Sequence, residues 1–366
     1  MKFIDQPVLE EGAIEASCAV FHDVLPRLAL QARLSVVVVF AALAASPAYG
    51  SCRIGNVAAL PVEIDSNQLL TTGAIDGKPV RVLIDTGSNM SLIWRSAAER
   101  LGLRLISAPH LRLFGLGGES RVDATFVAEL QVQSFRVKDL RIAVAGDRPG
   151  GGIDFIFGED FLGSRSVEFD LSHGVVRTME TAGCTAAELA YWSKTYSMAD
   201  LVASPRNLRA IRVDVLLNGH AVRAQLDSGS SATLLAKSVA DFAGVHYVSA
   251  SAEVVGIGEH SIRTWFGDVQ SFRLGDESIN NTRLRVAQLG KYQTMDRIGS
   301  RIRVPTGTEP QMVLGMDFLR AHRVLVDNTT RKLVFTYEGG PVFQISKPAR
   351  YSEASSATAR FPSVGN

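Results

Sequence analysis

The sequence predicts an all-β protein built from two homologous lobes, because one pattern of residues occurs twice. In each copy an apolar run leads into an aspartate and a tight turn, with Asp85, Thr86, Gly87 and Ser88 in the first copy and Asp227, Ser228, Gly229 and Ser230 in the second. The two aspartates lie 142 positions apart, and residues 76–103 match at this offset without a gap. Short strand-like runs separated by glycine turns surround both. A long period that occurs only twice indicates a duplicated domain.

Length and composition are those of a globular protein with two domains. The 366 residues are enough for a substantial core in each half. Hydrophobic residues make up 46% and charged residues 20% of the chain, and the formal net charge is +1. A chain this close to neutral lacks the excess of basic residues that binds phosphates, so we expect no nucleic-acid partner.

An apolar run of the secretory type precedes the repeats. Residues 34–45 are uncharged and apolar, follow basic residues, and lead to small residues around Ala48 and Gly50. This is the layout of a cleaved signal peptide, and the run is shorter than the roughly 20 residues of a membrane-spanning helix. We therefore expect residues 1–50 to be a presequence and the mature protein to be periplasmic or secreted. An uncleaved signal anchor is the alternative.

Two of the three cysteines, Cys52 and Cys184, lie in the predicted mature chain. In an exported protein such a pair can form a disulfide. Two unpaired thiols are the alternative, and the spacing leaves both open. Neither the cysteines nor the histidines have the spacing of metal ligands, so no metal site is predicted.

Each copy opens with a predicted β-hairpin. Its strands are expected over residues 69–75 and 79–84 in the first copy, and over 211–217 and 221–226 in the second. Asp76 and Gly77 form the first turn, and Asn218 and Gly219 the second, because these residue types tolerate positive φ.

A short helix is predicted after each aspartate, over residues 96–101 and 238–243, ended by Gly102 and Gly244. A glycine-rich bend then follows in each copy, with Gly115, Gly117 and Gly118 in the first and Gly256 and Gly258 in the second. These glycines do not open a helix as a dinucleotide-binding fingerprint would. A mobile β-hairpin is the better interpretation, and an ordinary surface hairpin is the alternative.

The third repeated element is an apolar run that ends in a glycine, over residues 155–162 and 312–319. Asp160 and Asp317 within it are interpreted as helix caps or local hydrogen-bond acceptors, not as a second carboxylate pair. The second half carries extra residues before this element, which we expect to form a polar loop over 291–307. A β-hairpin closes each half.

This order of elements resembles the aspartic peptidases, and most closely a single-chain fusion of two retropepsin-like halves. The resemblance implies two acid-protease β-barrel lobes related by pseudo-two-fold symmetry, with short helices. The boundaries follow as a lobe over residues 51–180, a linker with room for a short helix over 181–207, a second lobe over 208–345 and a disordered tail over 346–366.

The resemblance also assigns roles by position. Asp85 and Asp227 would be the catalytic pair. Thr86 and Ser228 would bond across the lobes, and Gly87 and Gly229 would let the backbone approach each carboxylate closely. The hydroxyls of Ser88 and Ser230 would brace the outer carboxylate oxygens. Gly158 and Gly315 would lie behind the active-site turns. The glycine-rich hairpins would act as flaps over the substrate. The first flap has no tyrosine, and whether one or both flaps close stays open.

The function that the resemblance implies is an exported aspartic endopeptidase. Two carboxylates held close together share one proton, so that one acts as base toward a water and the other as acid toward the peptide carbonyl. The expected substrate is an extended peptide or unfolded protein. The reaction is expected to need no metal and no organic cofactor. A monomer is expected because both halves lie in one chain. The alternatives are a catalytically silent peptide-binding protein of the same fold and a membrane-anchored structural protein.

Overall fold

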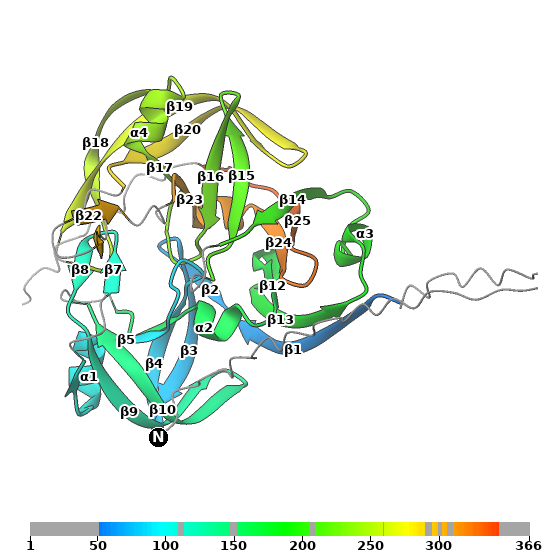
Figure 1. Ribbon diagram of the computed structural model, residues 1–366. Coiled ribbons are helices and arrows are strands. Elements are labelled where there is room, and N and C mark those ends of the chain that lie inside the picture. The colour runs from blue at the N-terminus through cyan, green and yellow to red at the C-terminus, as the bar shows by residue number, and fades with distance from the viewer. Residues whose placement is uncertain are drawn as a thin grey trace, which may run out of the picture. The chain divides into compact units, whose positions relative to one another are not determined.

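Two β-barrels of matching topology, each of six strands, lie in the two halves of the chain (Figure 1). The computed structural model describes residues 51–108, 113–146, 152–204, 209–258, 260–289, 295–298, 302–305 and 310–343. The predicted presequence, residues 1–50, and the predicted tail, residues 346–366, lie outside the described residues.

The first barrel has six strands, in the order β3 (Gln68–Ile75), β4 (Lys78–Ile84), β11 (Phe155–Phe157), β5 (Leu92–Trp94), β10 (Phe135–Ala145) and β9 (Asp123–Val132). It closes because β9 pairs back onto β3. The short strands β2 (Glu63–Asp65) and β6 (Ile106–Ser107) extend its edges. Ile84, Leu92 and Phe155 are fully buried inside it, and burial of each such side chain contributes roughly 1.5–3 kcal/mol.

The second barrel repeats this order with β15 (Arg212–Leu217), β16 (His220–Leu226), β23 (Met312–Leu314), β17 (Leu234–Ala236), β20 (Glu277–Ala287) and β19 (Ser261–Leu274). Here β19 pairs back onto β15, and β18 (His246–Val255) extends the edge. In both barrels the strand that leads to the aspartate pairs in parallel with the strand of the apolar-glycine element, β4 with β11 and β16 with β23. The all-β, two-lobe prediction with pseudo-two-fold symmetry is confirmed.

The hairpin turns have the predicted conformation. Asp76 and Gly77 have φ of 49° and 75°, and Asn218 and Gly219 have φ of 49° and 83°. Two consecutive residues with positive φ match the twist of the strands on either side, as in a type I′ turn.

The two short helices predicted after the aspartates are present as α1 (Arg95–Leu101) and α4 (Lys237–Phe242). The structure also contains α2 (Glu159–Leu162), α5 (Met316–Leu319) and a 3-10 turn at Leu171–His173. Gly102 and Gly244 follow α1 and α4 with φ of 69° and 64°, the left-handed conformation in which glycine commonly ends a helix. Within the described ranges, no helix is both long enough and apolar enough to cross a membrane.

Strands from both halves form one sheet between the barrels. Its order is β1 (Arg53–Pro61), β13 (Val175–Ala182), β12 (Ser166–Asp170), β24 (His322–Asp327), β25 (Lys332–Tyr337) and β14 (Ser197–Val202). The halves meet where β12 pairs with β24, with Phe169 opposite Val324. Because β14 also pairs with β15, the sheet continues into the second barrel.

Two segments contain more structure than the sequence predicted. The predicted linker holds the expected short helix, α3 (Ala186–Leu189), but also β14. No alternation marks β14 because most of its side chains are only partly buried. The predicted polar loop over 291–307 contains the paired strands β21 (Met295–Ile298) and β22 (Ile302–Pro305).

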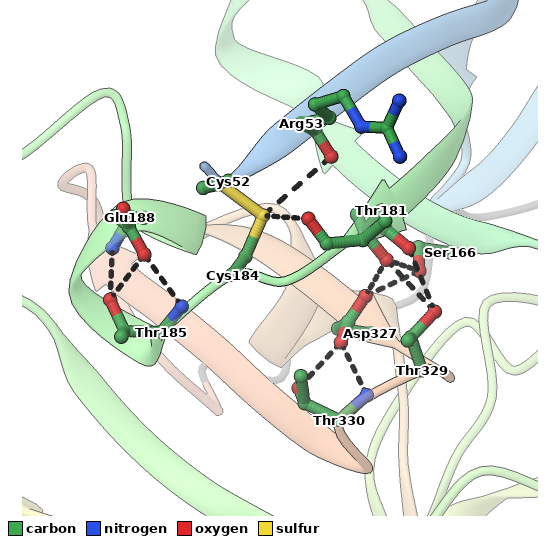
Figure 2. Close-up of a disulfide and its surroundings, with 11 residues drawn as sticks. Cys52, Arg53, Ser166, Thr181, Cys184, Thr185, Glu188, Asp327, Thr329 and Thr330 are labelled. Carbon is green, nitrogen blue, oxygen red and sulfur yellow. Dashed lines mark hydrogen bonds between the residues drawn. A yellow bond between two sulfur atoms is a disulfide. The ribbon is translucent and has the colours of Figure 1, made fainter. Parts of the chain in front are cut away.

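A disulfide joins Cys52, next to β1, to Cys184, just beyond β13 (Figure 2). Of the two alternatives for these cysteines, the structure contains the bonded form. Nearby, the buried Asp327 carboxylate accepts hydrogen bonds from Ser166, Thr181 and Thr330 (Figure 2). Burial opposes ionisation of Asp327, but these bonds outweigh it and lower its pKa. The disulfide and Asp327 therefore both stabilise the sheet between the barrels.

Replacing both cysteines by serine should destabilise the protein. The bond closes a loop with a sequence separation of 132, and removing a native disulfide typically costs about 2–5 kcal/mol. Denaturant titration of wild type and the Cys52→Ser/Cys184→Ser variant measures the effect. Reductant should destabilise wild type and leave the variant unchanged, and equal stability of the two oxidised proteins would contradict the prediction.

Candidate active site

The two aspartates occupy equivalent positions at the ends of equivalent strands. Asp85 follows β4 and Asp227 follows β16. The Asp85 N–H donates to the Phe157 carbonyl at 3.0 Å, and the Asp227 N–H donates to the Leu314 carbonyl at 2.9 Å. The parallel neighbours β11 and β23 therefore fix where each turn begins.

Backbone N–H groups hold each carboxylate from within its own turn. Asp85 Oδ1 accepts from the N–H groups of Gly87 and Ser88 at 2.9 and 3.1 Å. Asp227 Oδ1 accepts from Gly229 and Ser230 at 2.9 and 3.0 Å. Bonds of this kind stabilise the ionised form of a carboxyl group.

The hydroxyls of Ser88 and Ser230 do not brace the carboxylates, contrary to the role that the resemblance implied. Ser88 Oγ donates to the Met90 carbonyl and Ser230 Oγ to the Ala232 carbonyl, each at 2.8 Å. The hydroxyl of each serine thus closes a local turn with a carbonyl two residues ahead, while the backbone N–H of the same serine donates to the carboxylate. Both serines support the turns, but through the main chain.

The carboxyl groups of Asp85 and Asp227 lie next to each other at the seam, each against the glycine of the opposite turn. Glycine is required opposite each of them. A Cβ on Gly87 would lie 2.3 Å from Asp227 Cγ, and one on Gly229 would lie 2.3 Å from Asp85 Cγ. The structure thus brings together residues that are far apart in sequence, while both aspartates stay partly exposed.

Burial and mutual repulsion make the pair retain a proton. Burial, followed by the negative charge of Asp227, raises the pKa of Asp85 well above its usual range. Burial also raises the pKa of Asp227, against the opposing effect of the N–H groups of Gly229 and Ser230. Two adjacent carboxyl groups cannot both ionise easily, so the pair retains a proton to higher pH than two separate aspartates would.

Thr86 and Ser228 bond reciprocally across the two lobes, as predicted. Thr86 Oγ1 donates to the Leu226 carbonyl and accepts from the Ser228 N–H, both at 3.0 Å. Ser228 Oγ donates to the Ile84 carbonyl at 2.8 Å and accepts from the Thr86 N–H at 3.1 Å. Both side chains are buried, so the four bonds hold the two turns face to face.

Gly158 and Gly315 lie behind the turns, where the sequence placed them. A Cβ on Gly158 would lie 2.8 Å from the Ser88 carbonyl oxygen, and one on Gly315 would lie 2.6 Å from that of Ala232.

Asp160 and Asp317 are local acceptors, not a second pair. Asp160 Oδ1 accepts from the N–H and hydroxyl of Ser91, and Asp317 Oδ1 accepts from those of Thr233. Neither aspartate caps its helix with its side chain.

Glu159 is a third carboxyl group near the pair, and the sequence analysis did not single it out. It is the first residue of α2 and is 2% exposed. Burial, and then the negative charge of Asp85, raise its pKa to about 8. The signal that could have revealed it is a mismatch within the repeat, because the equivalent residue in the second half is Met316.

The glycine-rich bends of the two halves touch each other. The first is the hairpin β7 (Leu113–Gly115) and β8 (Gly118–Ser120), and the second joins β18 to β19. The Gly117 N–H donates to the Ile257 carbonyl at 2.9 Å, and the His260 N–H to the Gly117 carbonyl at 3.1 Å. Leu116 packs against a cluster of the second lobe that includes Leu234 and Val313.

Glycine is needed where the two bends meet. A Cβ on Gly115 would lie 2.4 Å from the Ile257 carbonyl oxygen, and one on Gly258 would lie 2.3 Å from the carbonyl carbon of Gly117. Gly118 has φ of 100° and Gly256 faces the Leu116 side chain. In this structure both bends take part in one contact.

Within the described residues, no group of three or more histidine, cysteine, aspartate or glutamate side chains is placed to hold a metal ion.

Replacing Thr86 by valine should destabilise the protein by about 2–3 kcal/mol. Valine has nearly the same shape as threonine, but the buried Leu226 carbonyl and Ser228 N–H lose their hydrogen-bond partner. Denaturant titration measures the loss. Thr72→Val, at an exposed threonine of β3, is the matched control and should change stability much less. A loss no larger than that of the control would contradict the role of this interaction.

A family model described as aspartyl protease matches residues 71–161 and 213–318, together more than half of the chain. Among solved structures, the chain is similar to the aspartic proteinase from Irpex lacteus, with a TM-score of 0.44 and 12% identity, covering 78% of this chain and 97% of that one. No curated protein sequence matches the chain. The chain belongs to the aspartyl protease family, and the match falls on both halves of its internal repeat.

Proposed function

We propose that the protein is an exported aspartic endopeptidase that hydrolyses peptide bonds with Asp85 and Asp227 as its catalytic pair. The observation that carries the proposal is the close approach of these two carboxyl groups at the seam of the lobes, where each lies against the glycine of the opposite turn. Membership of the family supports peptidase activity in general.

The chemistry follows from the shared proton. The ionised member of the pair takes a proton from a water held between the carboxyls, and the water oxygen attacks the peptide carbonyl carbon. The protonated member donates to the carbonyl oxygen as negative charge develops there. When the tetrahedral intermediate collapses, the carboxyl group that took the water proton gives it to the amide nitrogen, and a hydroxyl of the intermediate returns a proton to the other carboxylate. The C–N bond breaks, and the pair is again left with one proton. The reaction uses only the carboxyl groups and water.

The proposed substrate is an extended peptide or an unfolded protein. Among the described residues, β7 and β8 form a sheet of only two strands, and an extended peptide can bond to the edge of such a hairpin as an added strand. The bends must separate to admit it and can then close to exclude water. One copy of the chain holds both aspartates, so we propose that a monomer is active.

Asp85→Asn and Asp227→Asn should each lower cleavage of an unfolded protein by at least about a thousandfold, because an amide can neither take up nor share the proton. Peptide products quantified by mass spectrometry across acidic to neutral pH measure the effect. Asp139→Asn is the matched control, because Asp139 is exposed and has φ of 53°, which asparagine tolerates. Wild-type cleavage that persists in both pair variants would contradict the proposal, and binding without any cleavage would favour a silent peptide-binding protein.

Export of the protein predicts a processed N-terminus. The signal-like segment over residues 34–50 supports export, as does the Cys52–Cys184 disulfide, since such bonds persist in oxidising compartments. Cell fractionation followed by N-terminal sequencing should find the protein outside the cytoplasm, beginning near residue 51. A membrane-bound form that retains residues 34–50 would instead show an uncleaved anchor.

A further inference from the structure

Behind the Asp85 turn, the first lobe holds a carboxyl group where the second lobe holds a thioether. The Glu159 N–H donates to the Ser88 carbonyl at 2.9 Å, and the Met316 N–H donates to the Ser230 carbonyl at 2.8 Å. The two side chains occupy equivalent positions and are 2% and 0% exposed. Since methionine fills the position in the second lobe, packing alone does not require a carboxyl group there.

The surroundings of Glu159 favour its neutral form. The charged groups that act on it are the carboxylates of Asp85 and Asp160 and the guanidinium of Arg209. Arg209 Nη1 contacts the main-chain carbonyl of Glu159, at 3.5 Å, and not its carboxyl group. A Cβ on Gly163 would lie 2.4 Å from Glu159 Oε2, so the main chain at Gly163 lies directly beside that oxygen.

The other oxygen of Glu159 has no protein partner. Within the described part of the chain, no group donates to Oε1, which is fully buried. An ionised carboxylate without hydrogen bonds or an ion pair is costly to bury, so such a group takes up a proton instead. The first lobe therefore has a protonated carboxyl group next to the turn that carries Asp85, and the second lobe has no equivalent.

We propose that Glu159 is a positioning residue that acts on the catalytic pair through Asp85 and extends activity to higher pH. While Glu159 is neutral, the pair behaves as two carboxyl groups with one proton. When the pH rises and Glu159 releases its proton to solvent, its new charge makes loss of the remaining proton from the pair less favourable. The inference rests on the proposed function, since the affected proton is the one used in catalysis.

The expected effect does not require direct contact between the charges. At an effective dielectric constant of about 20, two carboxylates about 12 Å apart still shift each other's pKa by about one unit. Removing the Glu159 charge should therefore move the alkaline limb of the pH profile toward acid by about one pH unit. Just above the limb, kcat/KM should fall about tenfold for a shift of that size.

Glu159→Gln tests the proposal, because it keeps the shape and is neutral at every pH. The measurement is kcat/KM against pH for one peptide, with each profile scaled to its own maximum. We expect the alkaline limb of the variant to lie about one unit lower, and the acid limb to coincide with that of wild type. Scaled profiles that coincide throughout would overturn the proposal, because a purely structural role changes the maximum and not the limb.

A double exchange provides the matched control. Glu159→Met with Met316→Glu moves the carboxyl group from behind Asp85 to behind Asp227. Because the pair shares one proton, the alkaline limb should return toward the wild-type position. A folded double variant whose limb stays with that of Glu159→Gln would contradict action through the shared proton. If the double variant does not fold, the single variant decides alone.

Thermal stability tests the state of Glu159 without any activity. The pKa of Glu159 is about 8 in the folded protein and 4.5 ordinarily, so the unfolded chain binds fewer protons than the folded one between these values. Wild type should therefore lose stability relative to Glu159→Gln as pH rises from about 4.5 to about 8. Melting temperatures that differ by a constant amount from pH 4 to 9 would overturn the neutral state. If wild type cleaves no peptide, the proposed function fails, and this readout still reports on Glu159.

Discussion

The reciprocal hydrogen bonds between Thr86 and Ser228 are the interaction on which the other features of the site depend. Each hydroxyl crosses the seam to donate to a carbonyl and to accept an N–H of the opposite turn. All of these groups are buried, so separating the lobes would leave them without partners at considerable cost. The same bonds press Gly87 and Gly229 against the opposite carboxyl groups. Association of the lobes and assembly of the site are thus one event.

The carboxyl groups brought together in this way repel each other when both are ionised, and neighbouring main-chain groups and strand pairings offset this repulsion. Main-chain N–H groups stabilise the charged form of Asp85 and Asp227 from within each turn, while burial and the neighbouring charge raise the pKa of Asp85 and keep a proton on the pair. The sheet between the barrels provides a second attachment that does not involve the site, through the β12–β24 pairing. A strained arrangement of charges can persist because rigid elements on both sides hold it.

Features encoded by short local patterns could be predicted from the sequence. The hairpin turns at Asp76 and Asn218, the glycine helix ends and the positions of Asp85 and Asp227 follow from residue types at fixed spacing. The direction of the Ser88 hydroxyl could not be predicted, because the hydroxyl and the N–H of the same residue compete for one carboxylate. Strand β14 was missed because its partners, β25 and β15, lie far along the chain. Glu159 was missed because matching residues in a repeat draw attention, whereas a single unmatched residue does not.

The shared sheet imposes an order on the folding of the chain during synthesis. The first barrel has all of its strands by Phe157 and can form early, as domains of a growing chain commonly do. Its neighbour β12, however, needs β24 as a partner, and β14 needs β25, which ends at Tyr337. Pairings between such distant segments form slowly. The edge of β12 therefore stays open until β24, late in the second half, has left the ribosome.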